Sequence, residues 1–86
     1  MRKIVVKRLV YSDGCSADRI GGHEYDGALT DANILGSVHE LGKTQWIGQN
    51  LWLMRCGRPI YRITVATFTQ YQKSWYDLVL DALRRI

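Results

Sequence analysis

Apolar residues occur on both sides of the first β-rich run, residues 3–11 (KIVVKRLVY). One face of a strand would carry Ile4, Val6, Arg8 and Val10, and the other would carry Val5, Lys7, Leu9 and Tyr11. Apolar positions on both faces are typical of a central strand that is covered on both sides. The run therefore predicts a first, central strand that ends at the turn-forming Ser12-Asp13-Gly14.

The next segment, Ser12 to Leu29, shows neither a helical nor a strand period, because four glycines are mixed with polar residues. Its Asp26-Gly27 pair suits a tight type I′ turn. Two interpretations stay open. The segment is either a long loop, which at this length is more often functional than idle, or a short irregular pair of strands.

A helical period follows, with apolar residues on one face of a helix that Thr30 or Asp31 can cap. These residues are Ile34, Leu35, Val38 and Leu41, and Gly42 stands where a glycine ends many helices. Gly36 in the middle costs about 0.5–1 kcal/mol relative to alanine, so packing must hold this helix together.

Two β-rich runs between Gln45 and Thr67 flank Gly57-Arg58, which predicts a hairpin with a type II′ turn. Closing the hairpin at that pair sets Met54 opposite Tyr61, Trp52 opposite Ile63 and Asn50 opposite Val65 on the core face. The other face then carries Leu51, Leu53, Arg55, Ile60, Arg62 and Thr64. Pro59 has no N–H to donate, which implies a loosened or edge position after the turn.

The last segment predicts an amphipathic helix that starts between Thr67 and Ser74, since both ends of this interval offer capping-box residues. Its apolar stripe comprises Phe68, Tyr71, Trp75, Leu78, Val79, Ala82 and Ile86. We expect this stripe to pack on the sheet.

These elements predict a single small α+β domain over residues 1–86, with an antiparallel sheet of three or more strands packed against the C-terminal helix and a second, shorter helix. A hydrophobic fraction of 47% with one proline argues against disorder. No apolar run approaches the roughly 20 residues of a membrane span, and the N-terminus lacks the apolar stretch of a signal peptide. We therefore expect a cytoplasmic protein with no membrane partner and with reduced cysteines.

Charge is segregated along the chain, whose formal net charge is +4. Residues 1–11 carry +4, residues 12–42 carry −5 and residues 43–86 carry +5. The molecule is then either bipolar or neutralised internally, where oppositely charged blocks lie together.

Catalytic and metal chemistry find little support in the sequence. Cys15, His23, His39 and Cys56 are too widely spaced for a zinc module, and the acidic neighbours of Cys15 argue against a nucleophilic role for its thiol. No phosphate-binding glycine frame is present. We expect no enzyme activity, no metal and no cofactor.

Non-enzymatic protein binding is the function that the sequence favours. Arginine mixed with apolar anchors is typical of binding hot spots, which points to the hairpin residues Leu51, Leu53, Arg55, Arg58 and Arg62. The acidic segment adds Asp18, Glu24, Tyr25 and Asp26 as a second contact region. An adaptor, a homo-oligomer or a small inhibitor of the kind that phages and other mobile genetic elements encode fits this size.

Two alternatives stay open. Nucleic-acid binding would use the hairpin arginines together with Arg2, Lys3, Lys7 and Arg8. In the other, the first strand or the helix around Ile34 covers the hairpin leucines, because exposed apolar patches are rare in small monomers.

Overall fold

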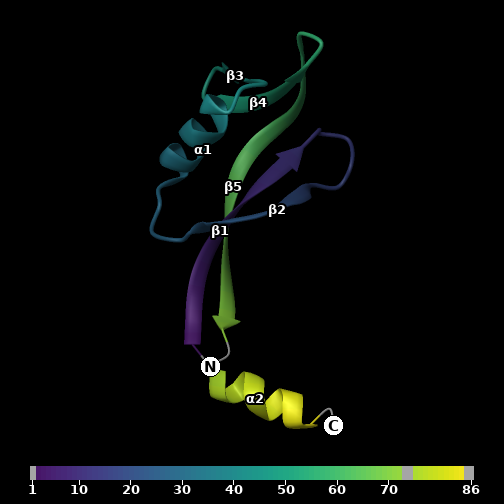
Figure 1. Ribbon diagram of the computed structural model, residues 1–86. Helices are drawn as coiled ribbons and strands as arrows, with labels where there is room; N and C mark the ends of the chain where they lie inside the picture. The colour runs from purple at the N-terminus through teal and green to yellow at the C-terminus, as the bar shows by residue number, and fades with distance from the viewer. Residues whose placement is uncertain (1, 73–74, 85–86) are drawn as a thin grey trace.

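The computed structural model describes residues 2–72 and 75–84, which form one antiparallel sheet and two helices (Figure 1). In chain order the elements are β1 (Arg2–Ser12), β2 (Arg19–Asp26), α1 (Asp31–Glu40), β3 (Thr44–Ile47), β4 (Asn50–Arg55), β5 (Arg58–Gln72) and α2 (Trp75–Arg84). The five strands are ordered β2-β1-β5-β4-β3 in the sheet. The predicted α+β class, with an antiparallel sheet and a C-terminal helix, is confirmed.

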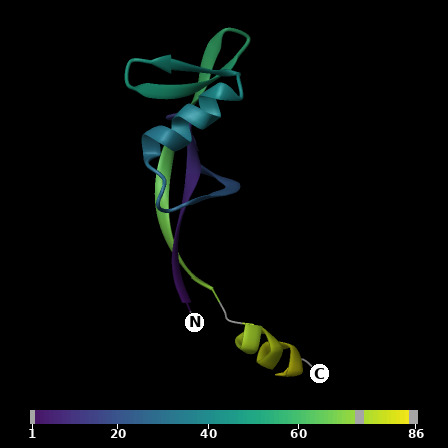
Figure 2. The ribbon, with the colours of Figure 1, turned by 60° about the vertical axis from the view of Figure 1, so that its left-hand side comes forward.

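The core lies between α1 and one face of the sheet (Figure 2). Its buried residues are Leu9 of β1, Leu51 of β4, Ile63 of β5, and Ile34 and Val38 of α1. As predicted, β1 is an inner strand, paired with β2 on one side and β5 on the other. On the opposite face no helix of the described residues covers β1, yet Val6, whose side chain alternates to that face, is only 8% exposed, so the expected cover is present there in part.

Helix α1 forms largely as its sequence predicts. The Thr30 side chain caps it by accepting a hydrogen bond from the Asn33 N–H at 3.2 Å, and Ile34 and Val38 face the core at 1% and 9% exposure. The chain turns away at Gly42, where φ is +90°. Leu41 falls outside the core because it lies at the helix end, where it is 85% exposed.

Residues 12–29 are ordered around a strand rather than forming a long loop. β2 pairs antiparallel with β1, and the connecting turn is held by the Asp13 carboxylate, which accepts hydrogen bonds from the N–H groups of Cys15 and Ser16 at 2.8 and 2.7 Å. These bonds hold the pKa of Asp13 below its usual value. The sequence carries no clear signal for β2, because its glycines interrupt the alternation of apolar and polar residues that is typical of a strand.

The hairpin between β4 and β5 forms, but the predicted turn and register are wrong. The turn residues are Cys56 and Gly57, with φ of +52° and +75°, as a type I′ turn requires. Leu51 pairs with Ile63 and Trp52 pairs with Arg62. Because side chains alternate across a strand, this slip of one residue exchanges the faces, so Leu51 is buried and Trp52 lies on the uncovered face.

The first of the two predicted β-rich runs is itself divided. It contains β3 and β4, which form a separate hairpin around Gly48, where φ is +63°. Trp46 of β3 pairs with Leu51 of β4 in this hairpin. The sheet therefore has one more strand at this edge than the two predicted runs imply.

The C-terminal region departs most from the prediction. β5 continues to Gln72, so Phe68 and Tyr71 lie in a strand, where they pair with Val6 and Lys3 of β1. Pairing with the whole of β1 supplies hydrogen bonds that outweigh the local helical pattern. The predicted start at Thr67 is therefore wrong, whereas the alternative start at Ser74 and the last stripe residue, Ile86, lie outside the described residues.

Helix α1, rather than α2, covers the sheet. α2 lies beyond the end of the sheet (Figures 1 and 2), and its Trp75 is 75% exposed. The helix predicted to be the shorter one, α1, has ten residues, which is as many as the described span of α2. The radius of gyration is 17.2 Å, against about 12 Å for a compact chain of this length. The molecule is therefore markedly elongated.

Candidate binding site at the β4–β5 hairpin

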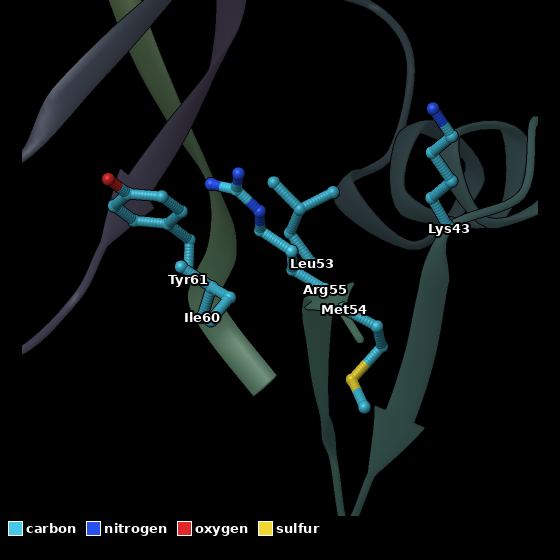
Figure 3. A pocket seen from close by; sticks show the side chains of 6 residues that line it. All are labelled: Lys43, Leu53, Met54, Arg55, Ile60 and Tyr61. Atoms are coloured by element: carbon cyan, nitrogen blue, oxygen red, sulfur yellow. The ribbon is translucent and has the colours of Figure 1, made fainter. Parts of the chain in front are cut away.

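A pocket of ≈ 300 Å³ lies beside the β4–β5 hairpin (Figure 3). Four of its lining side chains are apolar or aromatic and two are cationic; they are Leu53, Met54, Ile60, Tyr61, Lys43 and Arg55. Apolar walls with a few charged groups are typical of pockets that take part of a ligand. This pocket is the candidate functional site, and we call it the hairpin pocket.

An irregularity in the β4–β5 ladder shapes the pocket. Leu53 pairs with Tyr61 and Met54 pairs with Pro59, so Ile60 is an extra residue with no partner on β4. Such a bulge bends the strand and redirects the neighbouring side chains. Pro59 cannot donate to the ladder, which is consistent with a bulge at this point.

The turn after α1 brings Lys43 to the same place. Gly42 and Lys43 both have positive φ, +90° and +62°. The Lys43 carbonyl then accepts a hydrogen bond from the Met54 N–H at 2.8 Å, which fixes this turn against β4. A side chain from the turn after α1, outside both hairpin strands, thus becomes part of the pocket wall (Figure 3).

The hairpin cations have no acidic neighbours. Arg55 and Arg58 pair across the tip and both are exposed. The carboxylates of Asp31 and Glu24 form ion pairs elsewhere, with Lys7 and with Arg8 respectively. Within the part of the chain that the structure describes, no carboxylate lies within 4 Å of Lys43 or of the hairpin arginines. The tip therefore presents uncompensated positive charge.

The structure divides the predicted hairpin residues among three environments. Leu53 and Arg55 line the pocket and Arg58 lies at the tip beside it. Arg62 is exposed on the opposite face, paired with Trp52. Leu51 is 0% exposed beneath α1 and is unavailable to a partner. The idea that the helix around Ile34 covers this leucine is confirmed.

The acidic segment takes part in structural contacts. Glu24 accepts hydrogen bonds from Gln70 at 2.9 Å and from Arg8, and both hold its pKa below the usual value. Asp26 accepts a hydrogen bond from the Ala28 N–H at 2.9 Å in the turn after β2. Tyr25 packs against the core. These three residues stabilise the connection of β2 to the sheet, and Asp18 is simply exposed.

The N-terminal basic residues are also divided. The Lys7 ammonium donates to Asp31 at 3.1 Å and to the Leu29 carbonyl at 2.7 Å, and Arg8 pairs with Glu24. Oppositely charged blocks thus lie together at the middle of β1. Arg2 and Lys3 remain exposed at the far end of the molecule from the hairpin (Figure 1).

Sequence reasoning missed Lys43, Met54 and Tyr61 as site residues. The wrong register placed Met54 on the core face, and Lys43 carried no motif. Tyr61 lies on the same face as Ile63, as predicted, but a core-facing position gives no signal of a pocket. The adjacent Gly42 was a signal for a turn, although nothing local indicated that this turn would meet β4.

Three further observations concern redox, metal and membrane chemistry. Cys15 and Cys56 are free, exposed thiols in the two turns. In residues 2–72 and 75–84, no three His, Cys, Asp or Glu side chains come together as a metal site would require. Neither described helix has the length and apolar character to span a bilayer.

The fold and site thus define a small α+β domain with a cationic hairpin pocket. Comparisons of the chain with known proteins find no matching family model, no matching curated protein and no matching solved structure.

Proposed function

We propose that this protein binds another protein without catalysis, and that the hairpin pocket receives an apolar side chain flanked by carboxylates. The observation that supports this proposal is the combination of apolar walls, Leu53, Ile60 and Tyr61, with two uncompensated cations, Lys43 and Arg55. Arginine grips carboxylates in bidentate fashion, and buried apolar anchors supply most of the affinity of hot spots. An adaptor or a small inhibitor would both use such a pocket.

The pocket walls favour a protein partner over nucleic acid. A surface that tracks phosphates needs a continuous basic stripe, and its affinity comes mainly from charge. Here Lys7 and Arg8 are engaged by carboxylates, while Arg2 and Lys3 lie at the opposite end of a molecule 54 Å long. The remaining cations cluster at the hairpin around apolar side chains, which phosphate binding does not require.

A displayed library of random peptides tests the proposal. The wild-type chain should enrich peptides in which Asp or Glu adjoins Leu, Ile or Phe. Reversing both pocket cations, K43E with R55E, should weaken binding of the enriched peptides by about 100-fold to 10,000-fold, because each of the two charge-assisted hydrogen bonds contributes about 1.5–3 kcal/mol. The matched control is R19E, which reverses an exposed arginine on β2.

Three outcomes would contradict the proposal: no enriched peptides, enriched peptides without acidic residues, or equal binding by K43E/R55E and wild type. A titration of generic duplex DNA at two salt concentrations examines the alternative. Tight DNA binding that falls steeply with salt, and that K43E/R55E abolishes, would assign the hairpin to phosphate contacts instead.

A further inference from the structure

The exposed apolar side chains of this protein are concentrated at one end. We define the terminal arm as residues 2–5, 69–72 and 75–84, that is, the free end of the β1–β5 ribbon and helix α2 (Figure 1). Of the twelve exposed large hydrophobic side chains in the described chain, seven belong to this arm, Val5, Tyr71, Trp75, Tyr76, Leu78, Val79 and Leu83. An apolar concentration of this kind marks an interaction surface.

The terminal arm lacks the packing that its elements need. The described span of α2 is ten residues, and isolated helices of this size are marginal in water. Residues 2–4 of β1 pair only with β5, because β2 begins its pairing at Val6 and the Gly27 N–H donates to the Val5 carbonyl. On the other side, β4 pairs with β5 only as far as Ile63. A two-stranded ribbon is also marginal alone. Both elements would gain stability from a partner that covers them.

We infer that a second copy of this chain covers the terminal arm, so that the protein forms a two-fold dimer in which α2 and the ribbon end of each copy pack together. An isologous interface requires a patch that is complementary to itself. The arm offers a broad apolar stripe, since seven of the ten residues of α2 are apolar. Trp75 and Tyr76, whose ring centroids are 6.0 Å apart in an edge-to-face arrangement, are of the residue types that anchor interfaces.

The exposed area matches what such a dimer needs. With roughly 150–250 Å² per aromatic side chain, the three arm aromatics, which are 59–75% exposed, leave on the order of 400 Å² uncovered. The four aliphatic residues, at 46–59% exposure, bring this to roughly 600 Å². Specific interfaces bury about 600–1,000 Å² per partner. The arm of one copy is therefore sufficient for one side of a small, stable interface.

Charge favours a second copy over a lipid surface. Helices that lie on membranes carry many lysines and arginines on their polar side. The polar residues of α2 are two aspartates and one arginine. With Arg2 and Lys3 on the ribbon, the described residues of the arm carry a formal charge of +1, and Lys73 and Arg85, which adjoin α2 in the sequence, raise the total to +3. Salt at physiological strength screens a repulsion of this size between two arms. The arm also projects from the core (Figure 2), which leaves room for a second arm beside it.

Light scattering with sedimentation across the micromolar concentration range tests this dimer. The wild-type chain should reach twice the monomer mass. L78D with L83D should raise the dissociation constant at least about 100-fold, because two apolar anchors would be replaced by charges. The control I20D with L41D changes two side chains that are 54% and 85% exposed outside the arm, and it should dimerise like wild type.

Hydrogen exchange provides a second measurement that does not depend on a variant. Amides of residues 75–84 should become more protected as the protein concentration rises. A wild-type chain that stays monomeric would overturn the inference, whether α2 proves unprotected, folded onto its own sheet or bound to anionic phospholipid vesicles. Dimers that survive L78D/L83D but not I20D/L41D would also overturn it. Since none of these changes touches the hairpin pocket, the outcome is independent of the peptide experiment.

Discussion

Leu51 is the residue whose truncation most directly tests the observed fold. It is 0% exposed and packs in a cluster with Leu9, Ile34, Val38 and Ile63. A fully buried leucine loses about 2.7–5.0 kcal/mol of stability when it is replaced by alanine, because transfer energy is lost and a cavity remains. A chain of 86 residues has a total stability of roughly 4–13 kcal/mol. L51A should therefore remove about a fifth of the stability or more.

Urea unfolding followed by far-UV circular dichroism measures this loss. With a slope of about 1–3 kcal/mol per molar urea, the midpoint should fall by roughly 1–5 M. The control is L41A, the same substitution at a residue that is 85% exposed, where we expect a change within about 0.5 kcal/mol. All variants are compared at one low protein concentration, because self-association would add to the apparent stability.

The refuting result is specific. A loss below about 1 kcal/mol for L51A, or a loss no larger than that of L41A, would mean that Leu51 is not in the core. In that case the hairpin would have the register that places Trp52 inward, and Leu53 and Arg55 would no longer face the same side as α1.

Two other predictions concern β2 and its contacts. Gly27→Ala should destabilise the protein by about 1–3 kcal/mol, because a Cβ there would lie 2.7 Å from Val5 Cγ1 and closer still to the Val5 carbonyl oxygen. Gly22→Ala on β2, with no atom within 4 Å of the new Cβ, should be neutral or stabilising in the same urea assay; equal losses would refute the close approach. The lowered pKa of Glu24 means that its ionised form stabilises the fold above the unfolded pKa and that this contribution is lost as pH falls through the folded pKa. Glu24→Gln should therefore lose less stability than wild type between pH 7 and pH 3 in urea unfolding, and equal slopes would contradict this role.

Local chemistry in the sequence determined where several elements form. The β-branched run of residues 3–11 predicted β1. Thr30 and Gly42 marked the ends of α1, and Ile34 and Val38 its buried side. These features depend on near neighbours: a cap needs a donor three residues away, and a stripe needs the 3.6-residue period. The α+β class followed from them.

Tertiary structure alone decided the register of the hairpin and the identity of the covering helix. Registers that differ by one residue have similar local energies, and the choice between them depends on which side chains α1 covers. Phe68 and Tyr71 fit a helical stripe, yet the eleven residue pairs between β1 and β5 hold them in a strand. The same long-range pairing carries α2 beyond the core.

The hairpin pocket illustrates this division. Arg55 and Leu53 could be named from the sequence because they stand beside a recognisable turn. Lys43 joined them only through the hydrogen bond between its carbonyl and Met54, and Leu51 left the candidate site because α1 buries it. The sequence determined which residues could recognise a partner, whereas contacts between distant segments decided which of them are exposed together.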